Sequence, residues 1–195
     1  FFFKQKPEYE ILSGLVGSEM CIRDRSRCAV FRFRPLADDQ VLSMITSVAE
    51  GEGIKLDADA AEAIVHVSLG DLRKAITSLQ VASSMDEHVT REIVYETTAT
   101  APPEELHQFF LACREDGFQP ARRRLRGLLD RFGLAGTDLI NQLHRGLGDV
   151  EFLSETQKLD ATEAMAEADF RMVEGGGEAL QLDAMTARLC SMLSQ

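Results

Sequence analysis

Cysteine is scarce in this sequence, and the four residues present do not form a motif. Cys21, Cys28, Cys113 and Cys190 are scattered, and no two of them stand in a C-x-x-C arrangement. This spacing indicates neither a zinc site nor a disulfide framework, so reduced and mostly buried thiols are expected. Long apolar runs are also lacking, because none approaches the roughly 20 residues that a membrane-spanning helix needs. We therefore expect no membrane partner.

Two nucleotide-binding motifs are missing as well. The sequence contains neither a G-x-x-x-x-G-K-[ST] phosphate loop (Walker A) nor an acidic magnesium-binding strand (Walker B). Because both motifs are missing, we expect that this chain does not hydrolyse ATP alone. Their absence does not decide whether the chain is part of a larger enzyme.

Positive charge is in deficit, and the formal net charge is −11. Residues 1–25 carry equal numbers of acidic and basic groups, so the whole excess lies in residues 26–195. Affinity for nucleic acid comes largely from neutralising phosphates, so strong DNA binding by this chain alone is not expected. The 195 residues suffice for one or two domains with a real core, and 45% hydrophobic residues is an ordinary globular composition.

The first 25 residues differ in character from the rest. They lack the layout of a signal peptide, since Lys4 and Lys6 follow the opening phenylalanines and no long apolar core succeeds them. They are similar to a peptide that recurs as a translated sequencing adapter. We expect residues 1–25 to be a non-native leader and leave them out of the fold prediction; a genuine divergent N-terminus is the alternative.

One short strand and a small helical bundle are predicted next. Cys28 to Phe33 is rich in β-formers, and Pro35 ends this strand. Asp38 and Asp57 are the expected N-caps of the first two of three helices, and Gly70 precedes the third. A short further segment covers about 90–95. The apolar faces are Val41, Leu42, Ile45, Val48 and Ala49, then Ala60, Ala61, Ile64, Val65 and Leu69, then Leu72, Ala75, Ile76 and Leu79.

Consecutive prolines in the segment ATAPP (99–103) predict a stiff linker. After it the pattern is wholly helical and typical of an antiparallel bundle joined by short turns. A long helix is expected from about Ser154 to Val173, followed by a glycine turn at 174–177. The apolar stripes of the other helices are Leu106, Phe109, Phe110 and Cys113; Leu125, Leu128, Leu129 and Phe132; Leu139, Ile140, Leu143 and Leu147; and Leu182, Met185, Leu189 and Met192 or Leu193.

Two arginines have settings that suit phosphate chemistry. Arg27 is the second residue of the run SRCAVFRF at 26–33, and a guanidinium on a rigid strand end can stabilise charge on a transferring phosphate. Arg73, in GDLRK at 70–74, is expected in the first turn of a helix, where phosphates are favoured. The alternatives are a surface arginine beside a strand and a solvated helix arginine with Asp71 as the cap.

These motifs, in this order, resemble those of clamp-loader ATPases, and in particular the small subunits of replication factor C of the archaeal type. The resemblance covers residues 26–195. It rests on SRCAVFRF, on GDLR and on three longer stretches, which are EIVYETTATAPPEEL (92–106), GLAGTDLINQLHR (133–145) and ADFRMVEGGGEALQLDAMTARL (168–189). The chain departs from the family where Gly175-Gly176-Gly177 replaces Gly-Ala-Asn.

The resemblance implies a mainly α fold in which an AAA+ helical lid follows one residual strand and precedes an all-α collar domain. Residues 26–34 would be the end of the AAA+ core, 35–98 the lid, 99–103 the linker and 104–195 the collar, which serves oligomerisation. The chain would then be the C-terminal part of such a subunit.

The implied function is to help assemble the ATP-dependent ring that loads the sliding clamp onto primer–template DNA in replication. Arg27 would be an arginine finger acting in trans on an adjacent subunit's ATP, and Arg73 the sensor-2 residue on the ATP of its own subunit. ATP and Mg²⁺ are expected in the assembled complex, with none bound by this chain alone. The expected partners are the other loader subunits in a hetero-oligomeric ring, the sliding clamp and, through the complex, DNA. The expected location is the cytoplasm, or the nucleus in a eukaryote.

The arginine-rich run at 122–126 invites a nucleic-acid interpretation. Without interleaved aromatic residues, a solvated or partner-facing helix surface is the better prediction, and a neighbour's acidic 151–183 segment is a possible partner. The four histidines, His66, His88, His107 and His144, are isolated and are predicted to be packing or surface residues.

Two other classes of protein stay open. The chain could be a non-catalytic helical oligomerisation module whose arginines have lost their role. It could also come from another AAA+ DNA-processing ATPase, such as a bacterial loader subunit or a Holliday-junction helicase. The helicase predicts a basic winged-helix ending, and the acidic helical C-terminal part argues against it.

Overall fold

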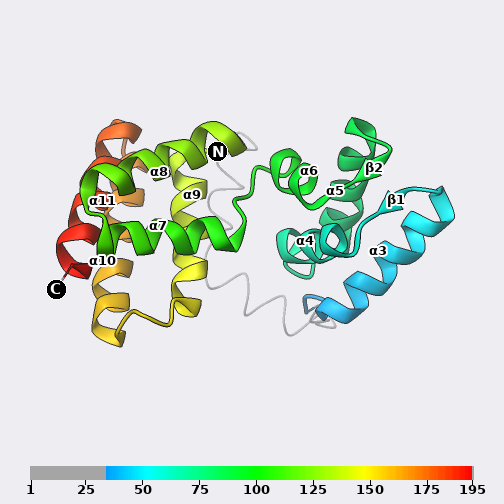
Figure 1. Cartoon of the computed structure of the whole chain (residues 1–195), viewed down its shortest axis with the longest axis horizontal. Coiled ribbons are helices and arrows are strands. Elements are labelled where there is room, and N and C mark those ends of the chain that lie inside the picture. Colours follow the sequence, from blue (N-terminus) through cyan, green and yellow to red (C-terminus); the bar gives the residue numbers. More distant parts are fainter. Residues whose placement is uncertain (1–33, 195) are drawn as a thin grey trace, which may run out of the picture. The chain divides into compact units, whose positions relative to one another are not determined.

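The computed structural model describes residues 34–194, and Figure 1 labels their helices and strands. Leu36–Gln195 form one compact unit, in which helices carry nearly all of the regular structure. The mainly α class is therefore confirmed. The strand expected at 28–33 and Arg27 lie outside the described residues, as does the leader at 1–25.

A first helical group contains four helices and two short strands. Its elements are α3 (Asp38–Glu52), β1 (Lys55–Leu56), α4 (Ala58–Ser68), α5 (Leu72–Met85), β2 (His88–Val89) and α6 (Arg91–Thr97). The strands pair in parallel, with Lys55 opposite His88 and Leu56 opposite Val89. The segment at 90–95 thus becomes a fourth helix, and the strand pair is an addition to the expected bundle.

The caps of the first two helices differ in detail from the prediction. Asp38 is the first helical residue of α3 and Ala37 holds the N-cap position; there the Asp38 carboxylate lies in the first turn, where the helix dipole favours negative charge. Asp57 holds the N-cap position of α4, but its side chain accepts no bond from the helix backbone. Its Oδ1 lies 2.7 Å from Nε2 of His88 instead.

The apolar faces of this group mostly form its core. Val41, Ile45, Ile64 and Leu79 are fully buried. Leu42 and Leu69 are exceptions. Leu42 is 37% exposed, and Leu69, which ends α4 in a left-handed conformation with φ 54°, is 55% exposed. A left-handed residue leaves the helical path, so Leu69 does not continue the buried stripe of α4.

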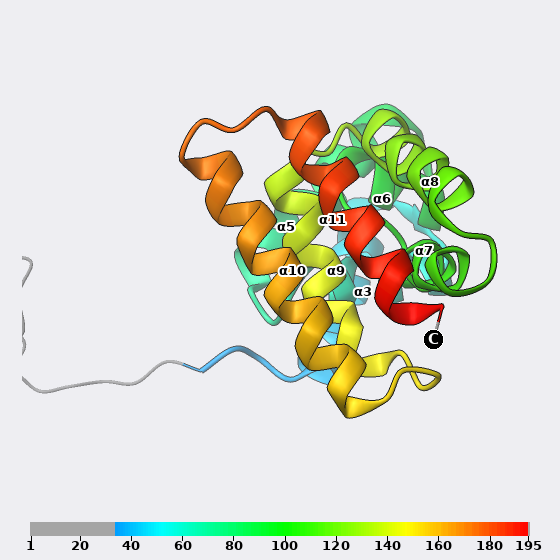
Figure 2. The ribbon, with the colours of Figure 1, turned by 90° about the vertical axis from the view of Figure 1, so that its left-hand side faces the viewer.

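A second helical group follows. Its elements are α7 (Pro103–Glu115), α8 (Phe118–Phe132), α9 (Gly136–Gly146), the 3₁₀ turn η1 (Leu147–Asp149), α10 (Glu155–Val173) and α11 (Glu178–Leu193). α11 contacts each of the other four α-helices, and Figure 2 shows it lying beside α10. The four predicted stripes line this core, and Phe109, Phe110, Leu139 and Leu189 are completely buried.

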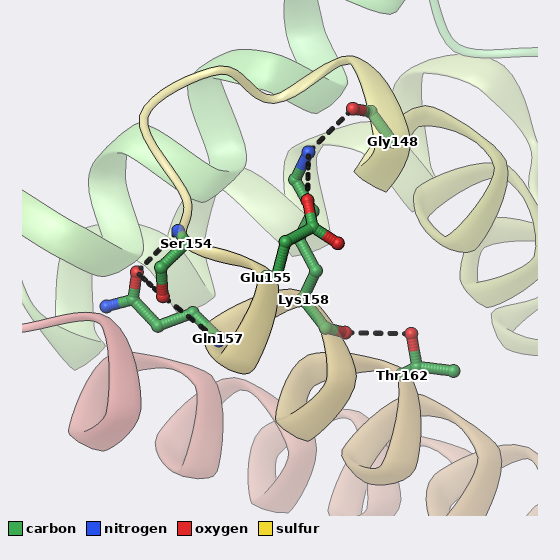
Figure 3. Close-up of polar contacts among 6 residues, drawn as sticks. All are labelled: Gly148, Ser154, Glu155, Gln157, Lys158 and Thr162. Atoms are coloured by element: carbon green, nitrogen blue, oxygen red, sulfur yellow. Dashed lines mark hydrogen bonds and ion pairs between the residues drawn. The ribbon is translucent and has the colours of Figure 1, made fainter.

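The start of α10 shows why the chain becomes helical there (Figure 3). The backbone N–H of Gln157 donates to Oγ of Ser154 at 3.2 Å, and the backbone N–H of Ser154 donates to Oε1 of Gln157 at 3.0 Å. This reciprocal pair is a capping box, which satisfies backbone donors that the first turn leaves free. Lys158 Nζ then donates to the carbonyl of Gly148 at 2.8 Å and fixes α10 to η1.

Candidate functional site

The turn before α5 has a defined geometry. Leu69 and Gly70 are both left-handed, with φ 54° and 78°. Asp71 is the N-cap of α5, and its Oδ1 accepts from the backbone N–H of Lys74 at 3.1 Å. The carbonyl of Gly70 accepts from Leu36 N–H at 3.0 Å, which ties this turn to the segment before α3. The first turn of α5 is therefore fixed from both sides.

Arg73 lies in this first turn, as predicted. Its side chain is exposed and makes no hydrogen bond or ion pair within residues 34–194. It borders a groove of about 340 Å³ that Asp71, Thr77 and Thr98 also line. Lys74 is also exposed and lines the same groove. A free guanidinium at a helix N-terminus is suited to a phosphate oxygen.

The junction of the two helical groups is held by polar contacts. Oε1 of Gln142 accepts from the backbone N–H of Ala101 at 2.8 Å, and its Nε2 donates to the carbonyl of Ala99 at 3.2 Å. Arg91 on α6 forms an ion pair with Glu104 on α7 at 2.7 Å. These contacts join the helices on both sides of the proline-containing linker.

A cavity of about 570 Å³ lies at this junction. Its lining includes His66 and Lys74 from the first group and His107 and Arg145 from the second. Burial and the nearby Arg145 charge lower the pKa of His66. The cavity therefore favours the neutral form of this imidazole.

The arginine-rich run on α8 is engaged within the chain. Arg122 and Arg126 both pair with Asp183 of α11, at 2.6 and 3.0 Å. Arg124 pairs with Glu105 of α7 at 3.2 Å. The run therefore serves helix–helix contacts within the chain, and the acidic partner of Arg122 and Arg126 comes from the same chain and not from a neighbouring subunit as predicted.

The histidines and cysteines of the described region form no metal site. Among residues 34–194, no group of three or more histidine, cysteine or acidic side chains is arranged to hold a metal ion. His88 pairs with Asp57, and His107 packs edge-on against Phe152 at 5.3 Å between ring centroids. Both confirm the packing or surface role predicted for these histidines.

Two thiols are buried together. Cys113 on α7 and Cys190 on α11 are both free and buried, as expected for a chain without a disulfide framework. Burial raises the pKa of Cys113 strongly, and the neighbouring Cys190 adds to that rise. Both groups are therefore neutral packing residues near pH 7.

Sequence reasoning missed Gln142 and assigned the partner of Asp183 to a neighbouring subunit. Gln142 falls between the buried Leu139 and Leu143, and a polar residue within an apolar stripe is a usable signal that a buried hydrogen-bond partner exists. Asp183 lies at the end of the acidic 151–183 segment that was predicted to meet the arginine run of a neighbouring subunit, and the structure pairs it with α8 of its own chain instead.

Comparison with known protein families assigns both helical groups. Residues 43–84 match the RCF1/5-like AAA+ ATPase lid domain, and residues 101–188 match the replication factor C C-terminal domain. The fold is thus an AAA+ lid followed by a clamp-loader C-terminal domain. The chain belongs to the replication factor C family, which confirms the resemblance found in the sequence. We call α3–α6 the lid and α7–α11 the collar.

Several curated relatives carry the name replication factor C small subunit. The one from Natronomonas pharaonis is 42% identical over 179 residues, which is 92% of this chain and 55% of that protein. The one from Haloarcula marismortui is 40% identical over 179 residues, with the same two shares of 92% and 55%. The one from Methanocella arvoryzae is 37% identical over 177 residues, or 91% of this chain and 55% of that protein. The chain therefore spans about half the length of these relatives.

Proposed function

We propose that this chain is the lid and collar of a clamp-loader subunit that helps load a sliding clamp onto primer–template DNA. Its relatives' name and its two matched domains support this role. The partners would be other loader subunits, the clamp and DNA, and the site of action the cytoplasm. None of the helices in the described residues is long and apolar enough to cross a membrane.

The observation that carries the proposal is the state of Arg73. Its guanidinium is exposed, and no described residue neutralises it. The first turn of α5 adds partial positive charge at the same place. Arg73 would contact the phosphate of ATP bound by its own subunit, in a complex that supplies the nucleotide and Mg²⁺. Arg27, outside the described residues, would act on a neighbour's ATP.

The collar offers a surface for subunit contacts. Leu159, Phe170 and Val173 on α10 and Leu180 on α11 are between 64% and 71% exposed. Three of them lie near the glycine turn between these helices, where their exposed apolar surface can be covered by another subunit. This feature also fits the alternative of a non-catalytic oligomerisation module, which would assemble without regard to ATP.

The test is a chimaeric subunit. The matching half of the Natronomonas pharaonis small subunit is replaced by residues 26–195 of this chain, and ATP hydrolysis of the reconstituted complex is measured with clamp and primer–template DNA. Charge-assisted hydrogen bonds are worth about 1.5–3 kcal/mol, so Arg73→Ala should weaken ATP binding or hydrolysis about 10- to 100-fold. Arg123→Ala is the matched control, because Arg123 is also exposed on a helix.

Equal activity of the Arg73→Ala and Arg123→Ala complexes would remove the sensor assignment. A chimaera that assembles equally well with and without ATP, and never responds to clamp or DNA, would favour the oligomerisation module.

A further inference from the structure

The junction between lid and collar depends on one buried side chain. Gln142 is 7% exposed, and Ala101, whose N–H it binds, is fully buried. We call the two hydrogen bonds from Gln142 to Ala99 and Ala101 the amide bridge. The amide oxygen meets a donor and the amide nitrogen meets an acceptor, so both ends of the side chain are satisfied.

The linker has few other backbone N–H groups that can hydrogen-bond to the collar. Pro102 and Pro103 have no backbone N–H, and the N–H of Thr100 is directed back to the carbonyl of Tyr95 at 3.2 Å. Ala101 N–H is therefore the last donor before α7, and the collar binds it through Gln142. Ala99 has φ 47°, a left-handed conformation that a non-glycine residue adopts only when its surroundings impose it.

The ion pair at the junction is more exposed than the amide bridge. The Arg91–Glu104 pair is partly exposed, with 32% and 66% of the two side chains accessible, and exposed ion pairs contribute little. The cavity of about 570 Å³ separates part of the lid from part of the collar. α6 does contact α8, but interfaces of this kind move unless they are large and apolar.

We infer that Gln142 is a positioning residue that fixes the lid on the collar. The amide bridge sets the conformation of the linker, and the linker sets the position of α5 with Arg73. The role of the bridge in the complex rests on the proposed function. There, the bridge would make Arg73 move together with the collar, which would pack against neighbouring subunits.

The bridge is tested by the distance between lid and collar in the whole chain. Spin labels are placed at Ser84→Cys on α5 and Thr156→Cys on α10, with Cys21 and Cys28 changed to serine, and the distance is measured by pulsed electron paramagnetic resonance. The unmodified bridge should give one narrow distribution. Gln142→Ala should broaden or shift it. Asn141→Ala is the control, because Asn141 is exposed and bonds only within α9, to the carbonyl of Thr137.

Gln142→Glu distinguishes the bridge from a simple packing role. An ionised carboxylate can accept from Ala101 but cannot donate to Ala99, whereas a protonated carboxyl can do both. The distribution of this variant should be broad at pH 7 and become narrow as the pH falls toward protonation, while the chain with Gln142 shows no such narrowing. If Gln142→Ala does not fold, this variant alone decides the question.

An unchanged distribution in folded Gln142→Ala, or a Gln142→Glu distribution that ignores pH, would overturn the bridge. In the chimaeric complex, Gln142→Ala should lower the stimulation of ATP hydrolysis by clamp and DNA. If the distances broaden while clamp and DNA still stimulate ATP hydrolysis fully, the coupling role is overturned. Failure of the proposed function would be seen separately, as equal activity of the Arg73→Ala and Arg123→Ala complexes.

Discussion

At the residue scale, Asp183 connects two helices. Its carboxylate binds Arg122 and Arg126 of α8, and it lies on α11, the helix that all other collar helices contact. The hydrogen bond and charge of Arg122 lower the pKa of Asp183. The ionised carboxylate is therefore the form that stabilises the collar, above the ordinary aspartate pKa, and this stabilisation is lost as the pH falls through the lowered value.

We expect Asp183→Asn to lower the urea midpoint of unfolding at pH 7, because two arginines lose their charged partner. The difference from the unchanged chain should shrink toward pH 3, because the pH then falls below the ordinary aspartate pKa of about 3.9, where the unfolded chain takes up a proton first. Circular dichroism in urea at both pH values measures this. Asp130→Asn, an exposed change on α8, should leave the midpoint nearly unchanged, and a deficit for Asp183→Asn that is the same at both pH values would contradict the charge argument.

The buried residues of the stripes could be read from the sequence, whereas the polar partners could not. Helical spacing alone places Phe109, Leu125 and Leu143 in the core. Asp183 and Gln142 bind groups 61 and 41 residues away. Such pairs depend on how helices pack, and local pattern carries no information about that.

At the element scale, α10 depends on its first turn. It is the longest described helix, and its buried residues are mostly alanines, with Met165 the one large side chain. A helix that buries so little apolar area gains less from packing. Its N-terminal capping box is therefore a larger share of its stability than in a helix with a leucine stripe.

Ser154→Ala should cost about 1 kcal/mol of stability, the usual effect of removing a serine cap. Urea unfolding followed by helical circular dichroism measures it. Thr156→Ala, two residues later and exposed, is the control and should be neutral or slightly stabilising, because alanine is the better helix former. Equal midpoints for the two variants would mean that the capping box contributes nothing.

The helices themselves were largely predictable, and the strand pair was not. Ser154, the glycine turn and the prolines at 102–103 marked element ends correctly, because capping and turn chemistry are local. β1 and β2 have two residues each. Strands this short show no alternating pattern, and their pairing is set by the packing of α4 and α5.

At the scale of the whole molecule, the junction of lid and collar should respond to pH. The pKa of His66 is lowered, first by burial and then by Arg145, with Arg91 and Lys74 acting in the same direction and Glu104 opposing them. The folded state thus binds fewer protons than the unfolded state just below the ordinary histidine pKa of about 6.5. Stability is fully present above that pH and falls as the pH drops through this window.

We expect the thermal midpoint of the chain to fall modestly between pH 7.5 and 5.5, and His66→Gln to flatten this dependence. Scanning calorimetry across the range measures it. His107→Gln serves as the control, since it changes an imidazole at the same cavity. If the pH dependence survives in His66→Gln but disappears in His107→Gln, the effect belongs to His107 and the assignment to His66 is wrong.

The two helical groups were visible in the sequence as patterns on either side of ATAPP, but their junction was not. Nothing in the prolines predicted the left-handed Ala99 or the cavity beside it. The motifs around Arg73 were enough to predict the family from the sequence. The exposure of Arg73 and the turn that fixes the start of α5 could be described only from the structure.

The position of α11 has a consequence for how this chain folds during its synthesis. This helix follows the other collar helices in the chain and contacts every one of them. Because proteins are synthesised from the N-terminus and domains fold as units, the collar cannot close on the ribosome until α11 has emerged. The lid can fold earlier. Translation therefore sets the order in which the two domains form, with the collar core the later of the two to close.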